Sequence, residues 1–170
     1  MSAFDPRRIL EVLHAHEVDY VLVGGLGGAL HGSPLPTLDV DIVPSLEKSN
    51  LDRLADALNE METVMRVASD PFEIKLEFTG RSLQKWLIEF RFLNLATRYG
   101  RLDLIERPAG TAGYRDLAPN ASGERIGDFE VRLAALEDII RSKSASDRER
   151  DRQQLPTLRR LLERKRPENS

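Results

Sequence analysis

Two aspartates separated by a single valine are the strongest candidates for chemistry in this sequence. Asp39 and Asp41 lie in residues 38–43, where apolar and acidic side chains alternate and predict a β-strand. Strand positions i and i+2 face the same side and lie about 7 Å apart along the strand. Two carboxylates held in this way repel each other, and a cation between them relieves the repulsion. Hard oxygen ligands of this kind favour Mg2+, which also accepts oxygens from a substrate phosphate.

A diglycine precedes this pair and is the second candidate. Gly24 and Gly25 follow residues 20–23, a β-rich run that indicates a buried strand. Glycine lets the backbone come close to a triphosphate, with backbone amides and a helix N-terminus facing it. Both patterns also have plainer interpretations, a tight turn for the diglycine and a solvated strand face for Asp39 and Asp41. The apolar neighbours of the two acids disfavour a solvated face, because central strands rarely carry unpaired acids.

The elements that must position these residues follow from apolar periodicity and turn residues. Helices are predicted at about 6–16, 26–31, 51–61, 82–89, 134–146 and 155–165, with Asp5 capping the first and Pro156 in the first turn of the last. Strands are predicted at 20–23, 38–43, 72–78, 92–97 and 101–105, with a hairpin at 126–131. This order predicts a mixed β-sheet flanked by helices, an α/β (α+β) fold with a helical C-terminal part. We expect one domain over 1–170, with an α/β core over 1–130 and a helical extension over 131–166.

The composition excludes several classes of protein. The 170 residues are 41% apolar and 31% charged, which suits one packed domain. No cysteine is present, so disulfides, zinc–thiolate sites and thiol catalysis are excluded. No apolar run approaches the roughly 20 residues needed to cross a bilayer, and the N-terminus does not have the pattern of a signal peptide. We therefore expect a cytoplasmic protein that is not inserted in a membrane.

The charge of the chain is unevenly distributed. The net charge is −3, yet residues 141–166 contain ten Lys or Arg against four Asp or Glu. A basic segment of this kind can follow phosphates. A solvated helix face explains the same pattern, and charge alone does not separate the two interpretations.

The spacing of the two motifs resembles a known signature. Val23-Gly24-Gly25, thirteen residues and then Asp39-Val40-Asp41-Ile42 is similar to the signature of the DNA polymerase β-like nucleotidyltransferase superfamily. The glycine-rich run 24–32, followed by Thr37-Leu38-Asp39-Val40-Asp41, resembles the AbiEii-type branch, which includes the MenT-type toxins. The resemblance covers Asp19 to about Leu162. It implies a nucleotidyltransferase fold and Mg2+-dependent transfer of a nucleotide from an NTP to an acceptor hydroxyl.

The resemblance also implies roles for residues outside the aspartate pair. Such enzymes commonly add a third carboxylate from a neighbouring strand, and Asp103 lies where it is expected. It would complete a metal site with Asp39 and Asp41, or accept the proton of the attacking hydroxyl as a base. Gly24, Gly25 and Thr37 are expected to bind the substrate. The alternative for Asp103 is a surface acid beside a turn.

A C-terminal lysine followed by arginine and aspartate is a further feature of AbiEii-type proteins, and Lys143, Arg148 and Asp151 match it. Lys143 would offset triphosphate charge, Arg148 would contact substrate, and Asp151 would hold the lysine. Lys143, Asp147 and Asp151 are spaced i, i+4, i+8 and would share a face on a continuous helix. A salt-bridged surface helix is the alternative interpretation. Many relatives have an arginine where this sequence has Leu35, which leaves phosphate binding to Lys143, Arg148 or another base.

The expected partners also come from the resemblance. MenT-type relatives modify the 3′ end of tRNA and act as toxins beside a cognate antitoxin. The expected partners are therefore an NTP, a tRNA and an antitoxin protein. Two alternatives stay open: transfer to a protein or a small aminoglycoside-like acceptor, and a non-catalytic binding module with the same fold.

Overall fold

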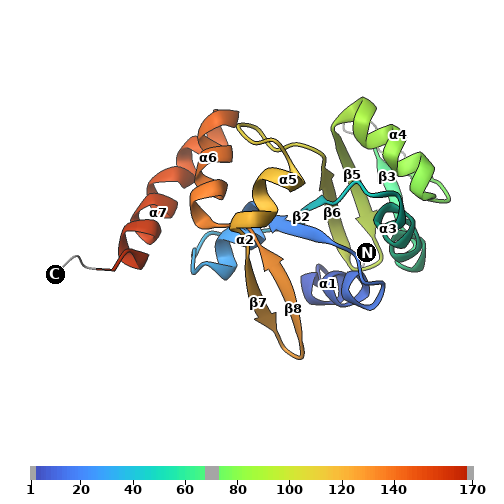
Figure 1. Ribbon diagram of the computed structural model, residues 1–170, viewed down its shortest axis with the longest axis horizontal. Coiled ribbons are helices and arrows are strands. Elements are labelled where there is room, and N and C mark those ends of the chain that lie inside the picture. The colour runs from blue at the N-terminus through green and yellow to red at the C-terminus, as the bar shows by residue number, and fades with distance from the viewer. Residues whose placement is uncertain (1–2, 68–72, 168–170) are drawn as a thin grey trace.

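The protein is described by a computed structural model over residues 3–67 and 73–167. Helices and strands alternate along the chain (Figure 1). The helices are α1 (Pro6–Ala15), α2 (Gly24–Leu30), α3 (Lys48–Glu60), α4 (Gly80–Phe90), α5 (Tyr114–Leu117), the 3-10 helix η1 (Ala118–Asn120), α6 (Leu136–Ser146) and α7 (Glu149–Lys165). The strands are β1 (Tyr20–Val23), β2 (Asp39–Pro44), β3 (Val64–Arg66), β4 (Glu73–Lys75), β5 (Phe92–Thr97), β6 (Gly100–Ile105), β7 (Ser122–Ile126) and β8 (Phe129–Leu133).

Within the described residues, the strands form one mixed sheet in the order β4-β3-β5-β6-β2-β1-β8-β7. Two neighbouring pairs are parallel, β2 with β6 and β1 with β8. The other neighbouring pairs are antiparallel. The parallel pairing of β2 and β6 matters most for function, because it places two sequence-distant segments in register at the centre of the sheet.

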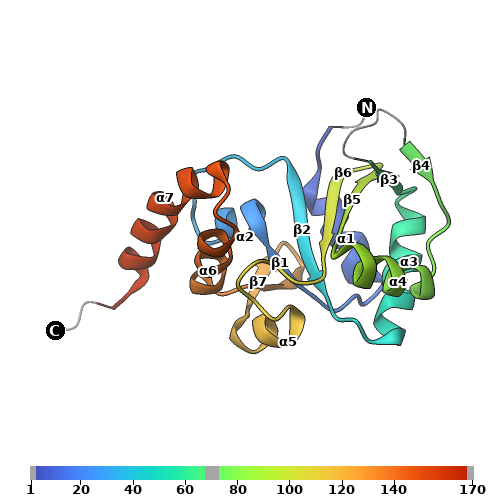
Figure 2. The same ribbon diagram turned by 90° about the horizontal axis from the view of Figure 1, so that it is seen from above.

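One face of the sheet is covered by α1, α3 and α4, which lie together at one end of the molecule (Figures 1 and 2). Asp5 starts α1 by accepting a hydrogen bond from the Arg8 backbone amide, and Pro6 follows in the first turn. The apolar sides of these helices bury the larger core against alternate strand residues. Fully buried members of that core include Leu13, Leu54, Leu58, Leu83, Leu87, Ile42, Leu95, Leu102 and Leu104.

In the described residues, a second apolar cluster covers the opposite face of the sheet around β1, part of β2 and Ile105 at the end of β6. There Val23 and Val43 pack against α5, α6 and α7. The helical side chains in this second cluster are Leu117, Leu136, Ile139 and Leu158. Over β6, β5 and β3 the same face carries polar, partly exposed residues, among them Asp103, Asn94 and Arg66. The apolar cluster and these polar residues are therefore neighbours on this face, and the polar ones Asn94 and Asp103 line a cleft.

The predicted fold class is confirmed, and the boundaries of several elements differ from those predicted. Helix α2 begins at Gly24 rather than at residue 26. Helix α7 begins at Glu149, so the placement of Pro156 in a first turn is wrong and this proline lies inside the helix. The polar stretch 149–154 gave no apolar periodicity from which that start could be predicted. The segments β3, α5 and η1 were not predicted, and residues 68–72, including the expected start of a strand at Phe72, lie outside the described residues.

The predicted division at residue 130 has no independent test and stays a prediction. Strand β8 continues to Leu133, and the helical part begins at Leu136. In the described part of the chain, no helix is both long enough and apolar enough to cross a membrane.

A buried asparagine connects the start of β1 to the end of β2. The Asn50 side-chain amide donates to the carbonyls of Asp19 and Ser45, both at 2.8 Å, and its oxygen accepts from the Asp19 amide at 2.7 Å. Asn50→Ala should therefore lower the free energy of unfolding by about 3 kcal/mol, because buried backbone groups lose their partners. Urea unfolding would measure this loss. Asp56→Ala, on the exposed side of the same helix, should change little, and equal effects of the two would contradict the assignment.

Candidate metal centre and cleft

Three carboxylates meet at the middle of the sheet. Register in the parallel β2–β6 pair places Asp41 opposite Asp103. Asp39 lies two residues before Asp41 and therefore shares its face. One carboxylate oxygen from each of the three residues lies within 4.8 Å of the others. All three side chains are partly buried, so together they form a set of hard oxygen ligands that suits a divalent cation such as Mg2+.

Gly24 is required at the adjacent turn because there is no space for a side chain. The register of β1 and β2 pairs Val23 with Asp41, so the turn that follows β1 lies beside the carboxylates. Gly24 has a φ of +68°, a left-handed conformation that favours glycine, and a Cβ there would overlap the Asp41 carboxylate. At Gly25 a Cβ would lie 2.9 Å from Thr37 Oγ1. The diglycine thus lets the backbone approach Asp41 and Thr37 closely.

The carboxylate cluster is electrostatically strained when no cation is bound. Burial raises the pKa of Asp41 to about 8, and the charges of Asp39 and Asp103 add to the rise. Burial and the charge of Asp39 also raise the pKa of Asp103, to about 6. Protonated Asp41 donates a hydrogen bond to Asp103. This hydrogen bond opposes the increase in the pKa of Asp103. Near neutral pH the cluster therefore holds a proton that a divalent cation would displace.

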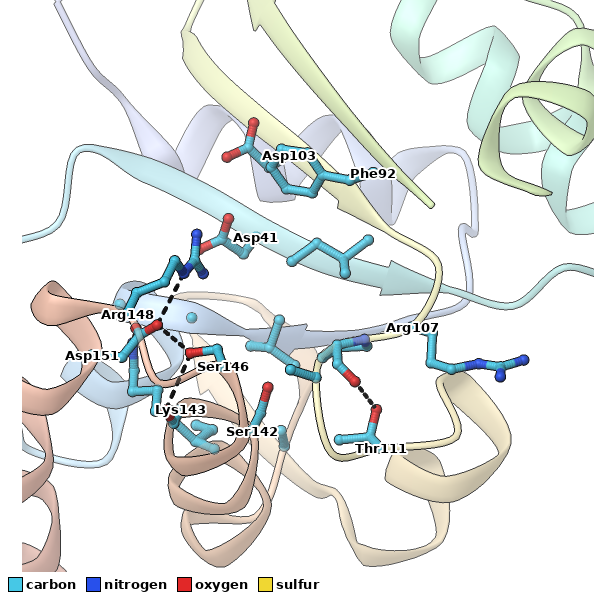
Figure 3. Close-up of a pocket in the computed structure, with 18 of the residues that line it drawn as sticks. Asp41, Phe92, Asp103, Arg107, Thr111, Ser142, Lys143, Ser146, Arg148 and Asp151 are labelled. Carbon is cyan, nitrogen blue, oxygen red and sulfur yellow. Dashed lines mark hydrogen bonds and ion pairs between the residues drawn. The ribbon is translucent and has the colours of Figure 1, made fainter. Parts of the chain in front are cut away.

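The corner between α6 and α7 brings a lysine and an arginine close to the carboxylates. Asp151 is 5% exposed and accepts hydrogen bonds from Lys143 Nζ at 3.3 Å, from Arg148 Nε at 3.1 Å and from Ser146 Oγ. Lys143 Nζ also donates to Gln154 at 2.8 Å. From this corner the Arg148 side chain extends toward Asp41 (Figure 3).

The chain does not form one continuous helix through this corner, so the i, i+4, i+8 spacing does not place Lys143, Asp147 and Asp151 on one face. Helix α6 ends at Ser146, and Asp147 has a left-handed conformation with a φ of 51°. Asp147 therefore points away from Lys143 and Asp151 and lies 3.6 Å from Arg152 in an exposed ion pair. Lys143 and Asp151 meet across the corner between two helices, rather than along one helix face.

A cleft of about 620 Å³ joins the carboxylates to this corner. Eight of the residues singled out in the sequence line it: Gly24, Gly25, Asp39, Asp41, Asp103, Lys143, Arg148 and Asp151. Thr37 contacts the strand that carries two of the carboxylates, because its hydroxyl donates a hydrogen bond to the Asp39 carbonyl at 3.0 Å. Leu35, which stands where many relatives have an arginine, does not line the cleft. The cations of the cleft are Lys143, Arg148, Arg150, Arg91 and Arg107.

Several lining residues were not found from the sequence. Ser146 and Gln154 contact the Lys143–Asp151 pair only because the chain turns at Asp147, and no spacing rule predicts that turn. Phe92 was assigned to a strand, but its 40% exposure and its position beside Asp103 could not be predicted (Figure 3). An aromatic residue at the start of a predicted strand was the only signal.

The fold is similar to those of solved nucleotidyltransferase structures. The lincosamide antibiotic adenylyltransferase LnuA, with lincomycin bound, aligns with 95% of this chain and 99% of its own at a TM-score of 0.61 and 17% identity. A provisionally assigned nucleotidyltransferase from Thermotoga maritima aligns with 96% of this chain and 98% of its own, at a TM-score of 0.52 and 17% identity. No protein-family model and no curated protein sequence matches the chain. At this identity the similarity shows a nucleotidyltransferase-like fold.

The raised pKa of Asp41 predicts a pH-dependent cost in stability. A carboxyl whose pKa is higher in the folded than in the unfolded state stabilises the fold at low pH, and that contribution is lost as pH rises through about 8. Without metal, Asp41→Asn should therefore unfold at higher urea than the unsubstituted protein at pH 9, by on the order of 2 kcal/mol, and should differ little at pH 5. Mg2+ should stabilise the unsubstituted protein and not the variant. A difference independent of pH, or one matched by the exposed control Asp128→Asn, would contradict this account.

Asp151 is predicted to stabilise the corner in the opposite pH range. Burial alone would raise its pKa, but the hydrogen bond from Ser146 and the charges of Lys143 and Arg148 outweigh burial and lower the pKa. Its stabilising contribution is therefore present above the ordinary value near 4 and is lost as pH falls through the lower folded value. Asp151→Asn should lower the free energy of unfolding by about 2–4 kcal/mol at pH 7, because two cations lose their partner. Urea titrations at pH 7 and pH 3 should show the difference shrinking, and an equal loss at both pH values would refute the role.

Proposed function

We propose that this protein is a Mg2+-dependent nucleotidyltransferase that moves NMP from an NTP to an acceptor hydroxyl. The convergence of Asp39, Asp41 and Asp103 within 4.8 Å, beside a glycine turn and a cleft that contains cations, carries this proposal. Asp39, Asp41 and Asp103 would hold the cation, which when bound would offset the charge that builds on the transferred phosphate. A non-catalytic module would have no need for this strained cluster.

The cleft separates groups suited to the phosphates from a group suited to the acceptor. Lys143 and Arg148 lie on the α6–α7 corner and would neutralise the β- and γ-phosphates. Gly24 and Gly25 would let backbone amides approach the same phosphates, because no side chain blocks them. Asp151 would not touch substrate but would orient both cations through its hydrogen bonds. In this scheme residues 1–130 supply the carboxylates, and 131–166 supply the cations.

Asp103 is the proposed base. Its pKa is raised to about 6 by burial and by the charge of Asp39, so its carboxylate is a stronger base than an ordinary aspartate. A base with a pKa close to the working pH accepts a hydroxyl proton most effectively. Asp103 would either accept this proton or complete the ligand set of the cation with Asp39 and Asp41.

A tRNA 3′ end is the acceptor that we propose, with the protein acting in the cytoplasm as the toxin of a toxin–antitoxin pair. Two features support tRNA: the resemblance of the glycine-rich run and the Thr37–Asp41 segment to AbiEii-type proteins, and the basic segment 141–166. Arg150 from that segment lines the cleft, and other cations extend along α7 away from it. A polyanionic acceptor could follow that surface. The toxin role and the antitoxin rest on the resemblance alone.

A small-molecule acceptor is the second candidate, and one observation favours it. LnuA, which aligns with nearly the whole chain, is an adenylyltransferase of a lincosamide antibiotic. The cleft of about 620 Å³ falls within the size range of small-molecule sites. The two candidates share the same carboxylates and differ only in what approaches Asp103.

One experiment tests the reaction and identifies the acceptor class. The protein is incubated with each α-³²P-labelled NTP and Mg2+, together with total tRNA, cell protein or a panel of aminoglycosides and lincosamides. Label in tRNA supports the first candidate, and label in a small molecule supports the second. Asp41→Asn and Asp103→Asn should each reduce transfer at least about 100-fold, because a metal ligand or the base is lost. Asp128→Asn is the matched control on an exposed hairpin, and retained transfer in Asp41→Asn would end the proposal.

A further inference from the structure

We propose that a second cleft, between the first residues of β1 and β8, binds a small zwitterion of the class of free amino acids with an aliphatic side chain. This cleft has a volume of about 290 Å³ and shares no lining residue with the cleft at the carboxylates. Its volume is at the lower limit of small-molecule sites, which suits a ligand of this size. The inference goes beyond the proposed function and does not depend on it.

The second cleft forms where β1 and β8 separate. Among the described residues, the two strands pair in parallel at a single position, which includes Leu22, and the β7–β8 hairpin extends beyond the rest of the sheet (Figure 1). Tyr20 and Val131 belong to the larger core on one side of the sheet. Glu130 and Arg132 alternate with Val131 along β8 and are exposed on its other side. All four residues line the cleft, so it lies in the gap that the separating strands leave.

The hydroxyl of Tyr20 is a polar group for which the fold provides no partner. Tyr20 is 6% exposed, and its ring packs in the larger core. Over residues 3–67 and 73–167, this hydroxyl makes no hydrogen bond. Burial raises the pKa of Tyr20, so the hydroxyl keeps its proton and can both donate and accept. A buried hydroxyl normally has a partner, and because Tyr20 lines the cleft, a bound ligand can supply one.

Glu130 and Arg132 offer opposite charges to the same cleft. Glu130 has no ion pair in the part of the chain that the structure describes, and its carboxylate lies over Gly123, where a Cβ would overlap it. Arg132 donates through Nη1 to Asp19 at 3.1 Å and to Tyr114 at 2.6 Å, and its other two nitrogens have no partner within the described ranges. Residues i and i+2 on a strand are about 7 Å apart, which leaves room for a short zwitterion between them. An ammonium beside the glutamate and a carboxylate beside the arginine would pair both groups.

The apolar part of the lining favours an aliphatic side chain on this zwitterion. Val18 and Val131 line the cleft and belong to the larger core, together with the ring of Tyr20. Contact with these side chains would remove aliphatic surface of the ligand from water. A nucleotide is disfavoured, because two carboxylates and only one guanidinium line the cleft.

Titration of the full chain with L-leucine, followed by saturation-transfer NMR, tests this site. Isoamylamine, which is leucine without its carboxylate, and isocaproate, which is leucine without its ammonium, are titrated in parallel. Leucine should bind at least about 10-fold more tightly than either analogue, because each analogue leaves one charged group of the cleft unpaired.

Three variants separate this site from general effects. Tyr20→Phe should weaken leucine binding about 3- to 10-fold and should not lower the urea midpoint of unfolding, because no protein group loses a hydrogen bond. Glu130→Gln should weaken binding at least about 10-fold, because the ammonium loses its counter-charge. Asp128→Asn removes another exposed acid from the same hairpin and should leave the affinity unchanged.

Several results would overturn the inference. Absence of leucine binding would mean that water alone satisfies Tyr20. Equal affinities for leucine and either analogue would exclude recognition of a zwitterion. Unchanged affinity in Tyr20→Phe or Glu130→Gln, or an equal loss in Asp128→Asn, would place the bound leucine elsewhere. Nucleotide transfer is measured separately and at different residues, so failure of one proposal leaves the other intact.

Discussion

The repulsion among three carboxylates at one point of the sheet is the constraint on which the site depends. Strand geometry places Asp39 and Asp41 on one face, and the parallel pairing of β6 adds Asp103 in register. The surrounding sheet is too well packed for these side chains to separate, because Val40, Ile42, Leu102 and Leu104 between them are completely buried. The fold thus contains an unfavourable interaction that a bound divalent cation would relieve, and such binding would increase stability.

The uneven covering of the sheet explains how a tightly packed protein keeps an accessible centre. On one face α1, α3 and α4 form a continuous core. On the other face, the α5–α7 group packs against β1, Val43 of β2 and Ile105 at the end of β6. The carboxylates lie at the border of that group, where the α6–α7 corner supplies cations and the cleft extends to Phe92 on β5. A site at this border can be partly desolvated, which strengthens its electrostatics, and still admit two substrates.

Features governed by local periodicity could be predicted, and features governed by long-range placement could not. The alternation of Leu38–Val43 was sufficient to predict that Asp39 and Asp41 share a face. The place of Asp103 came only from a family resemblance, because no local pattern specifies which strand β6 pairs with. The start of α7 was missed because residues 149–154 are polar, whereas the end of α6 at Ser146 agrees with the predicted helix 134–146. The exposure of Phe92 depends on which other segments pack over β5, and the residues of β5 alone do not determine this.

The parallel β2–β6 pair also has a consequence for synthesis. Between Pro44 and Gly100 the chain builds α3, β3, β4, α4 and β5 before it returns to the side of β2. Asp103 can therefore join Asp39 and Asp41 only after this intervening segment has been made and has folded. The cations of the α6–α7 corner lie still further along the chain. A nascent chain emerging from the ribosome carries the paired aspartates without the complete centre until the α6–α7 corner has been translated. Any activity that needs the complete centre therefore requires translation through the α6–α7 corner.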